Sequence, residues 1–242
     1  MRVGRIPYLN VFPYYRGNVC EHWEPFVDGP PSMLGRMAAE GLLDAAPLAA
    51  VDTFRLEESF EPLGALGIAS RGPVRSVLFF SRRPFNELSG GRVLLTQESV
   101  TSAALTRMLL EEANPNDIHF DTGDDARWAD GYLAIGDRAL RMQKEAPFAY
   151  CTDLGEAWYK KTRRPFVFAR WVVRRSASAA DKRKLEGDLK RALHQPLPEE
   201  IPNAAGLTDA EARDYLGHVV HALDEDCLAG LYLFKEKLHV LT

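Results

Sequence analysis

Two strongly apolar runs, VRSVLFFS from Val74 to Ser81 and PFVFARWVV from Pro165 to Val173, decide the fold that this sequence predicts. Both runs are rich in the β-branched and aromatic residues that favour strands. The first run follows Gly72-Pro73, a dipeptide that marks a break in the chain. We therefore expect two strands that cross between two domains and pair with each other.

Strand-like and helix-like segments alternate around these runs, which is typical of an α/β protein. Before the first run, Val3 to Ile6 reads as a buried strand, and a helix is expected to begin near Ser32 and to end at Gly41. Between the runs, strands are expected at GRVLLT, DIHF and YLAIGD, and helices at SVTSAALTRMLLEEA and RALRMQKE.

The sequence after the second run is expected to be helical. One helix is predicted over Ala179 to Leu193, with Leu185 and Leu189 on one face. A second is predicted from Thr208 to about Leu238, and the segment TDAE provides a capping box at its start.

These elements predict an α/β fold with two lobes, the type II periplasmic-binding-protein-like architecture, with a ligand cleft between the lobes. The first lobe is expected to comprise residues 1–75 and 171–242, and the second residues 76–170. In such a fold the ligand lies where strand ends and helix N-termini converge.

Composition narrows the classes of function. The chain has 242 residues, a formal net charge of -4 and an isoelectric point near 5.9. No clustered basic face is evident, which argues against nucleic acid as a partner. No run approaches the roughly 20 apolar residues of a membrane helix, and no signal-peptide pattern is recognisable, so we expect a cytoplasmic protein.

The sequence suggests neither a metal nor a cofactor. Cys20, Cys151 and Cys227 form no CxxC or Cys/His pattern, so we expect reduced packing residues rather than disulfides or a zinc site. No Walker, GxGxxG or HExxH pattern is present.

Polar residues at the corners between strands and helices are the candidate binding groups. Asn10 stands in the corner PYLN between two apolar segments, where it either binds a small anion or is a turn residue. In TQESVTSAAL a strand gives way to a helix, so hydroxyls and the positive helix end can receive a carboxylate, although an ordinary N-cap explains them as well. The hydroxyl residues of that stretch are Thr96, Ser99, Thr101 and Ser102.

Two further corners carry candidates of the same kind. In AIGDRAL, Gly136 allows close backbone approach, and Asp137 opens the next helix as a functional carboxylate or as an N-cap. Ser76 lies beside the first predicted crossing and is a third candidate for binding.

The order and spacing of these motifs over roughly residues 1 to 175 resemble those of the chorismate dehydratase family, which acts at the first step of the futalosine route to menaquinone. The motifs are PYLNVFP, GLLDAAPLAAV, GPVRSVLFFSRRP, ESVTSAAL, LAIGDRAL and DLGEAWYKKTRRPFVFARWVVR. One departure is Arg163-Arg164, where we expect a glycine and a small or apolar residue in many relatives.

This resemblance implies a cofactor-independent hydro-lyase that converts chorismate, a small dicarboxylate, to 3-[(1-carboxyvinyl)oxy]benzoate and water. Asn10 is then expected to position the substrate and its leaving hydroxyl. Proton removal falls to Asp137 or to the substrate's own enolpyruvyl carboxylate. The expected substrate-binding residues are Ser76, Ser99, Thr101, Ser102 and Gly136.

Three other functions share the expected fold. A solute receptor would need export. The sister enzyme dihydroxynaphthoate synthase resembles SPCPND at its opening motif rather than PYLN. A ligand-sensing regulatory domain would be expected to follow a DNA-binding helix-turn-helix.

Overall fold

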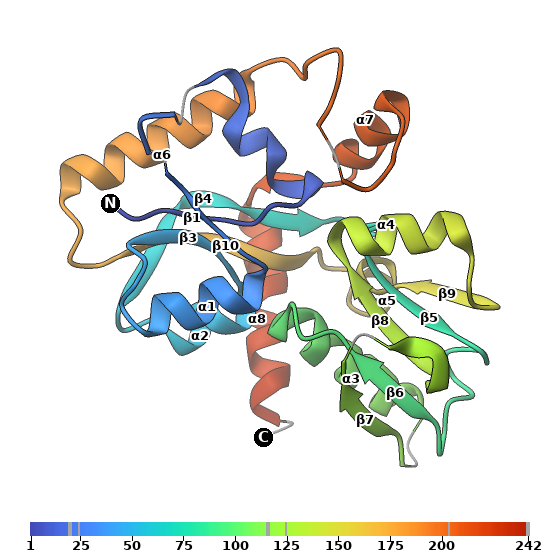
Figure 1. The fold of residues 1–242 in the computed structure, drawn as a ribbon. Helices are drawn as coiled ribbons and strands as arrows, with labels where there is room; N and C mark the ends of the chain where they lie inside the picture. Colours follow the sequence, from blue (N-terminus) through green and yellow to red (C-terminus); the bar gives the residue numbers. More distant parts are fainter. Residues whose placement is uncertain (19–20, 24, 115–116, 124, 203, 241–242) are drawn as a thin grey trace.

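Two β-sheets organise the chain in the computed structural model, which describes residues 1–18, 21–23, 25–114, 117–123, 125–202 and 204–240 (Figure 1). One sheet is antiparallel, and its strand order is β11 (Val220–Ala222), β4 (Phe60–Ser70), β10 (Phe166–Arg174) and β3 (Ala45–Ala49). We call this sheet and its helices the first lobe. The short parallel pair β1 (Gly4–Arg5) and β2 (Val27–Asp28) extends it through a bridge between Val3 and Ala45.

The second sheet has five strands, and we call it and its helices the second lobe. Its strand order is β7 (His119–Thr122), β6 (Arg92–Leu95), β8 (Gly131–Ile135), β5 (Val77–Ser81) and β9 (Tyr150–Asp153). Strands β6, β7 and β8 are parallel, whereas β5 is antiparallel to both β8 and β9. All five residues of β5 and of β8 are buried.

The two apolar runs are strands, as predicted, but the prediction that they pair with each other is wrong. Strand β5 pairs within the second sheet, and β10 pairs with β3 and β4 in the first. The longer of the two partners of β10 is β4, a strand that was not predicted from the sequence. We therefore propose that the lobes are divided at residues 71–76 and 163–165, which moves residues 166–170 from the second lobe to the first.

Helices cover both faces of the first sheet. On one face lie α6 (Ala179–His194) and the kinked 3-10 segment η1 (Leu9–Asn18); on the other lie α2 (Ala50–Arg55) and α8 (Glu225–Val240) (Figure 1). Leu185 and Leu189 of α6 are buried, as predicted. Helix α1 (Pro31–Ala39) packs against β3, and a 3-10 turn, η2, spans Glu21–Trp23.

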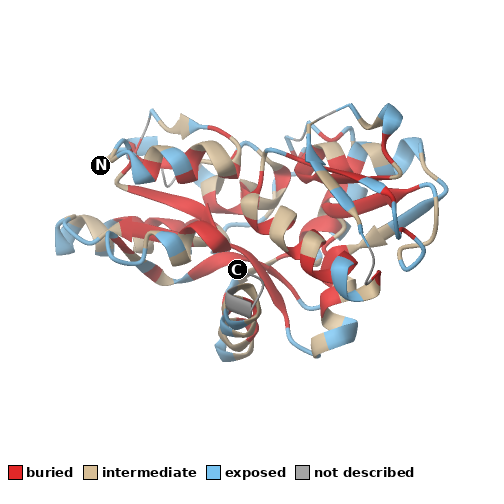
Figure 2. Cartoon of the chain, turned by 90° about the horizontal axis from the view of Figure 1, so that it is seen from below, coloured by how far each residue is buried: buried red, intermediate tan, exposed pale blue. Residues whose placement is uncertain are grey.

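The second sheet is covered on both faces as well. Helices α3 (Val100–Ala113) and α5 (Leu154–Thr162) cover one face, and α4 (Gly136–Glu145) covers the other. A 3-10 turn, η3 (Ala126–Trp128), precedes β8. Figure 2 shows that the central strands of both sheets are buried while the outer helical surfaces are exposed; the edge strands β7 and β9 are largely exposed as well.

The predicted long C-terminal helix is interrupted. The chain forms α7 (Asp209–Gly217), then β11, and then α8. The predicted capping box is present, because Thr208 and Glu211 satisfy each other's backbone N–H groups. Strand β11 pairs with β4, and this tertiary contact overrides the local helical pattern.

An aromatic cluster joins the lobes beside one crossing. Trp158 of α5, Phe166 of β10 and Phe234 of α8 lie with ring centroids 4.8 to 5.9 Å apart. Of the predicted packing cysteines, Cys227 is buried in the core, whereas Cys151 is exposed; both are free thiols, and Cys20 lies outside the described residues. In the described part of the chain, no helix combines the length and apolarity needed to span a membrane.

Arg163 occupies the position where the family resemblance leads us to expect glycine. It ends helix α5 in the left-handed conformation, with φ of 58°, and its N–H donates to the carbonyl of Tyr159. A residue with a Cβ pays about 1–2 kcal/mol for this conformation, which is why glycine is preferred there.

We expect Arg163→Gly to be more stable than Arg163→Ala by about 1 kcal/mol in urea unfolding, because the two variants differ only in the Cβ. The same pair of substitutions at Arg164, which lacks positive φ, serves as the control, and there alanine is expected to be the more stable. An alanine variant at least as stable as the glycine variant at position 163 would contradict this assignment.

Candidate active site

A small cavity lies between the lobes, where the two lobes' helix N-termini and strand ends meet. Its volume is about 40 Å³, which leaves room for only a few water molecules. Both lobes contribute to its wall. The lining residues are Ile6, Tyr8, Asn10, Pro31, Ile68, Val74, Ser76, Val77, Ser99, Ser102, Ile135, Gly136, Phe168 and Ala169.

The side chain of Asn10 reaches this cavity from η1. Its Oδ1 atom is buried and has no hydrogen-bond partner among the described residues. The Asn10 backbone is held from behind, because its carbonyl oxygen lies 2.7 Å from Nε2 of His221. A carbonyl only accepts, so His221 is the tautomer with a proton on Nε2. The backbone is thus anchored while the buried side-chain oxygen is left unsatisfied.

Three of the predicted hydroxyl residues line the cavity with their positions fixed by neighbours. Ser76 Oγ accepts a hydrogen bond of 2.8 Å from the phenol of Tyr215, which is fully buried. Ser99 is the N-cap of α3, since its Oγ accepts from the N–H of Ser102 at 3.2 Å. Ser99 therefore fulfils the capping role and also faces the cavity.

Thr101 and Thr96 do not line the cavity, although the sequence analysis placed Thr101 in the binding group and Thr96 among the candidates. Thr101 Oγ1 accepts a hydrogen bond of 2.9 Å from the N–H of Val51, at the start of α2 in the other lobe. Its hydroxyl therefore joins the lobes.

Asp137 also lies outside the cavity. Its carboxylate accepts a hydrogen bond of 3.0 Å from the N–H of Leu9 and faces a separate hollow on the outer side of η1. Burial raises the pKa of the Asp137 carboxyl, and hydrogen bonds from the backbones of Leu9 and Ala204 oppose that rise. The structure therefore places Asp137 behind the cavity wall, where it joins α4 to η1.

Gly136 is required by the close approach of Tyr8. Its φ is +57°, and a Cβ at this position would lie 2.8 Å from the Tyr8 ring. The Gly136 N–H donates to the carbonyl of Ser76 at 2.8 Å. Tyr8 in turn crosses to the second lobe, where its phenol donates to Glu98 at 3.0 Å.

The cavity wall is electrically neutral. None of its lining residues carries a charged side chain. Burial, together with the carboxylate of Glu98, raises the pKa of Tyr8. Burial lowers the pKa of His221 to about 4, so the ring behind Asn10 is neutral at pH 7. A ligand here would meet amide, hydroxyl and backbone dipoles rather than ions. Among the described residues, no cluster of three His, Cys, Asp or Glu side chains is placed to hold a metal ion.

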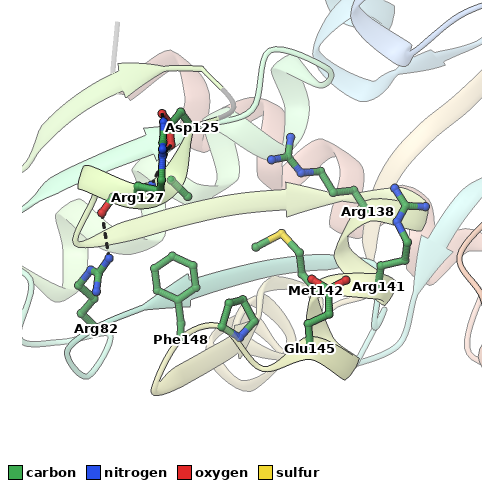
Figure 3. Close-up of a pocket in the computed structure, with 10 residues that line it drawn as sticks. Arg82, Asp125, Arg127, Arg138, Arg141, Met142, Glu145 and Phe148 are labelled. Atoms are coloured by element: carbon green, nitrogen blue, oxygen red, sulfur yellow. Dashed lines mark hydrogen bonds and ion pairs between the residues drawn. The ribbon is translucent and has the colours of Figure 1, made fainter.

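A wider hollow of about 530 Å³ opens on the second lobe, between α4 and the loop before β8 (Figure 3). The arginines of this hollow are exposed to solvent or already have partners within the protein. Arg127 forms an ion pair with Asp125, and Arg82 donates hydrogen bonds to the carbonyls of Arg127 and Ala129. None of the predicted site residues lines it, so the cavity between the lobes remains the candidate active site.

Comparison with known proteins shows the family of this chain. Residues 1–239 match the sequence profile of the family described as menaquinone biosynthesis. The chain belongs to this family. A curated chorismate dehydratase of Thermus thermophilus is 29% identical, and the alignment covers 98% of this chain and 94% of that relative. A curated chorismate dehydratase of Campylobacter jejuni is 28% identical, covering 91% of this chain and 89% of that relative.

The fold of this menaquinone biosynthesis family member is shared with binding proteins. A Candida albicans protein described as having the generic periplasmic-binding-protein fold superposes with a TM-score of 0.64 at 12% identity, covering 99% of this chain and 89% of that one. The predicted fold class is therefore confirmed.

Several residues of the site were not found from the sequence. Tyr8 belongs to the motif PYLN but was not singled out there, whereas Tyr215 and His221 lie outside the quoted motifs and within the predicted long helix. Gly217 followed by Val219 and Val220 was the available signal for a break in that helix and a short strand.

We expect Asp137→Asn to convert substrate at a rate within about fivefold of wild type, because the asparagine Oδ1 still accepts the hydrogen bond from the Leu9 N–H. Asp137→Leu leaves that buried donor unsatisfied, at a cost of about 1–3 kcal/mol, and is expected to lower turnover efficiency by roughly five- to a hundredfold. Steady-state kinetics of both variants test this. A loss in Asp137→Asn as large as in Asp137→Leu would show that the carboxylate itself is needed.

Proposed function

We propose that this protein is a hydro-lyase that dehydrates chorismate to 3-[(1-carboxyvinyl)oxy]benzoate. The observation that carries the proposal is the buried, unsatisfied amide oxygen of Asn10 in the cavity between the lobes. A buried polar atom without a partner costs about 1–3 kcal/mol, so its retention indicates a ligand that satisfies it. The two curated relatives named chorismate dehydratase support the identity of that ligand.

The chemistry suits a neutral cavity. A ring C–H bond and the neighbouring C–OH bond break, the proton and the hydroxide leave as water, and the ring becomes aromatic. The aromatic product supplies much of the driving force, so the protein has mainly to orient and desolvate the substrate. In this proposal Asn10 Oδ1 accepts from the leaving hydroxyl, and its amide N–H groups donate to a carboxylate.

The substrate's own enolpyruvyl carboxylate is the proposed base. None of the residues lining the cavity is an Asp, Glu, His or Lys, and Asp137 faces the outer hollow instead. Withdrawal from water raises the pKa of a carboxylate, so in a desolvated site it is a stronger base than in solution. Asp137 then acts indirectly, as a positioning residue for Leu9 and hence for Asn10.

Incubation of the purified protein with chorismate, followed by mass spectrometry, tests the reaction directly. We expect a product lighter by one water and carrying a 3-substituted benzoate. Chorismate left unconverted by folded protein would refute the proposed function.

Asn10→Asp tests the proposed binding role. Aspartate lacks the N–H donor and places a like charge against a dianion, so we expect turnover efficiency to fall by about a hundredfold or more, with the melting temperature within a few degrees of wild type. Asn86→Asp, the same change at an exposed site of the second lobe, should leave activity unchanged. A folded, fully active Asn10→Asp would exclude the binding role, and an unfolded one would make Asn10 a structural residue.

A further inference from the structure

A second pocket lies on the face of the first sheet that α2 and α8 cover. It is formed by α2, the start of β4, strand β10 and α8, and its volume is about 190 Å³. It shares no lining residue with the cavity between the lobes. Its wall contains Arg170, which interrupts the apolar run of β10.

Among the described residues, Arg170 is a half-buried cation without a carboxylate as counter-charge. Its Nε atom is buried and has no hydrogen-bond partner, and no carboxylate of the described residues forms an ion pair with it. Burial lowers the pKa of Arg170, and a hydrogen bond from its guanidinium to the neighbouring phenol of Tyr232 offsets only part of that effect. An uncompensated charge that is withdrawn from water is costly, which indicates that a negative group completes the site.

The carboxylates at the rim are already engaged with other cations. Glu57 pairs with Lys235 at 2.6 Å, and Glu61 pairs with Lys182 at 2.9 Å and with Arg175 at 3.3 Å. Three cations and two carboxylates therefore line the pocket, which leaves an excess of one positive charge. This balance suits a ligand with a single negative charge.

The remaining wall is largely apolar. Phe54, Phe60, Val172 and Leu231 line it, and Lys235 Nζ lies 5.3 Å from the centre of the Phe54 ring. At 190 Å³ the pocket is smaller than the roughly 300–1,000 Å³ of typical ligand sites. The ligand is thus a small molecule that combines one anionic group with an apolar body.

We propose that this pocket is a binding site for a small monocarboxylate with an apolar body of about the size of benzoate. Its carboxylate accepts hydrogen bonds from the Arg170 guanidinium, a geometry that arginine favours, and its body packs between Phe54 and Leu231. This site is independent of the proposed dehydration and lies on the opposite side of the sheet from η1.

Calorimetric titration with benzoate at low ionic strength tests the site. We expect saturable binding of one benzoate per chain, and at least tenfold weaker binding of benzamide, its neutral analogue. Arg170→Gln should weaken benzoate binding at least tenfold and leave chorismate turnover unchanged. Arg183→Gln, an exposed arginine on α6 across the sheet, is the matched control and should bind benzoate as wild type does.

The same titration distinguishes this pocket from the cavity between the lobes. Benzoate binding that is lost in Asn10→Asp and kept in Arg170→Gln would place benzoate in the cavity and overturn the proposal, as would equal binding of benzamide. If Arg170→Gln does not fold, isotope-filtered NMR of the wild type decides. Contacts from benzoate protons to Phe54 and Leu231 support the site, and their absence at saturation refutes it.

Discussion

The antiparallel pairing of β4 with β10 is the constraint on which the two-lobed arrangement depends. Ser70, the last residue of β4, is paired with Phe166, the first residue of β10, so both connections to the second lobe leave the first sheet from neighbouring positions. The lobes are therefore joined along one line, which allows hinge motion with few changes in backbone conformation. The aromatic contact of Trp158 with Phe166 and Phe234 lies beside this line and remains near the axis of such a motion.

Away from the hinge, the closed arrangement is maintained by hydrogen bonds between groups on opposite lobes. They include Leu9 N–H to Asp137, Val51 N–H to Thr101 and Tyr8 to Glu98. Each is worth only about 0.5–3 kcal/mol, so together they stabilise closure without making it irreversible. The same contacts align Asn10 and Ser76 on the cavity wall. Closing the lobes and completing the site are thus one event, and the cavity of about 40 Å³ cannot admit chorismate until they separate.

The sequence predicts the positions of helices and strands better than it predicts which strands pair with each other. The run Val77–Ser81 is a strand, but all its residues are buried, so no alternation of polar residues specifies which strand it pairs with. Strand β4 was missed because Pro62, Gly64 and Gly67 read as turn residues. In the site, Ser99 and Ser102 are three residues apart and share one helix face, whereas Thr101 is turned about 100° from Ser102 and meets the other lobe. Gly136 and Asp137 are adjacent in the sequence, and for the same reason Gly136 lines the cavity while Asp137 faces the outer hollow.

If the cavity between the lobes receives the substrate, small-angle X-ray scattering with a non-reactive chorismate analogue should detect the closing of the lobes. The radius of gyration of the free protein should exceed the value calculated from the closed structure, because the lobes must open for entry. Saturating analogue should reduce it to the closed value. An unchanged scattering profile, with binding of the analogue confirmed separately by calorimetry, would contradict the account.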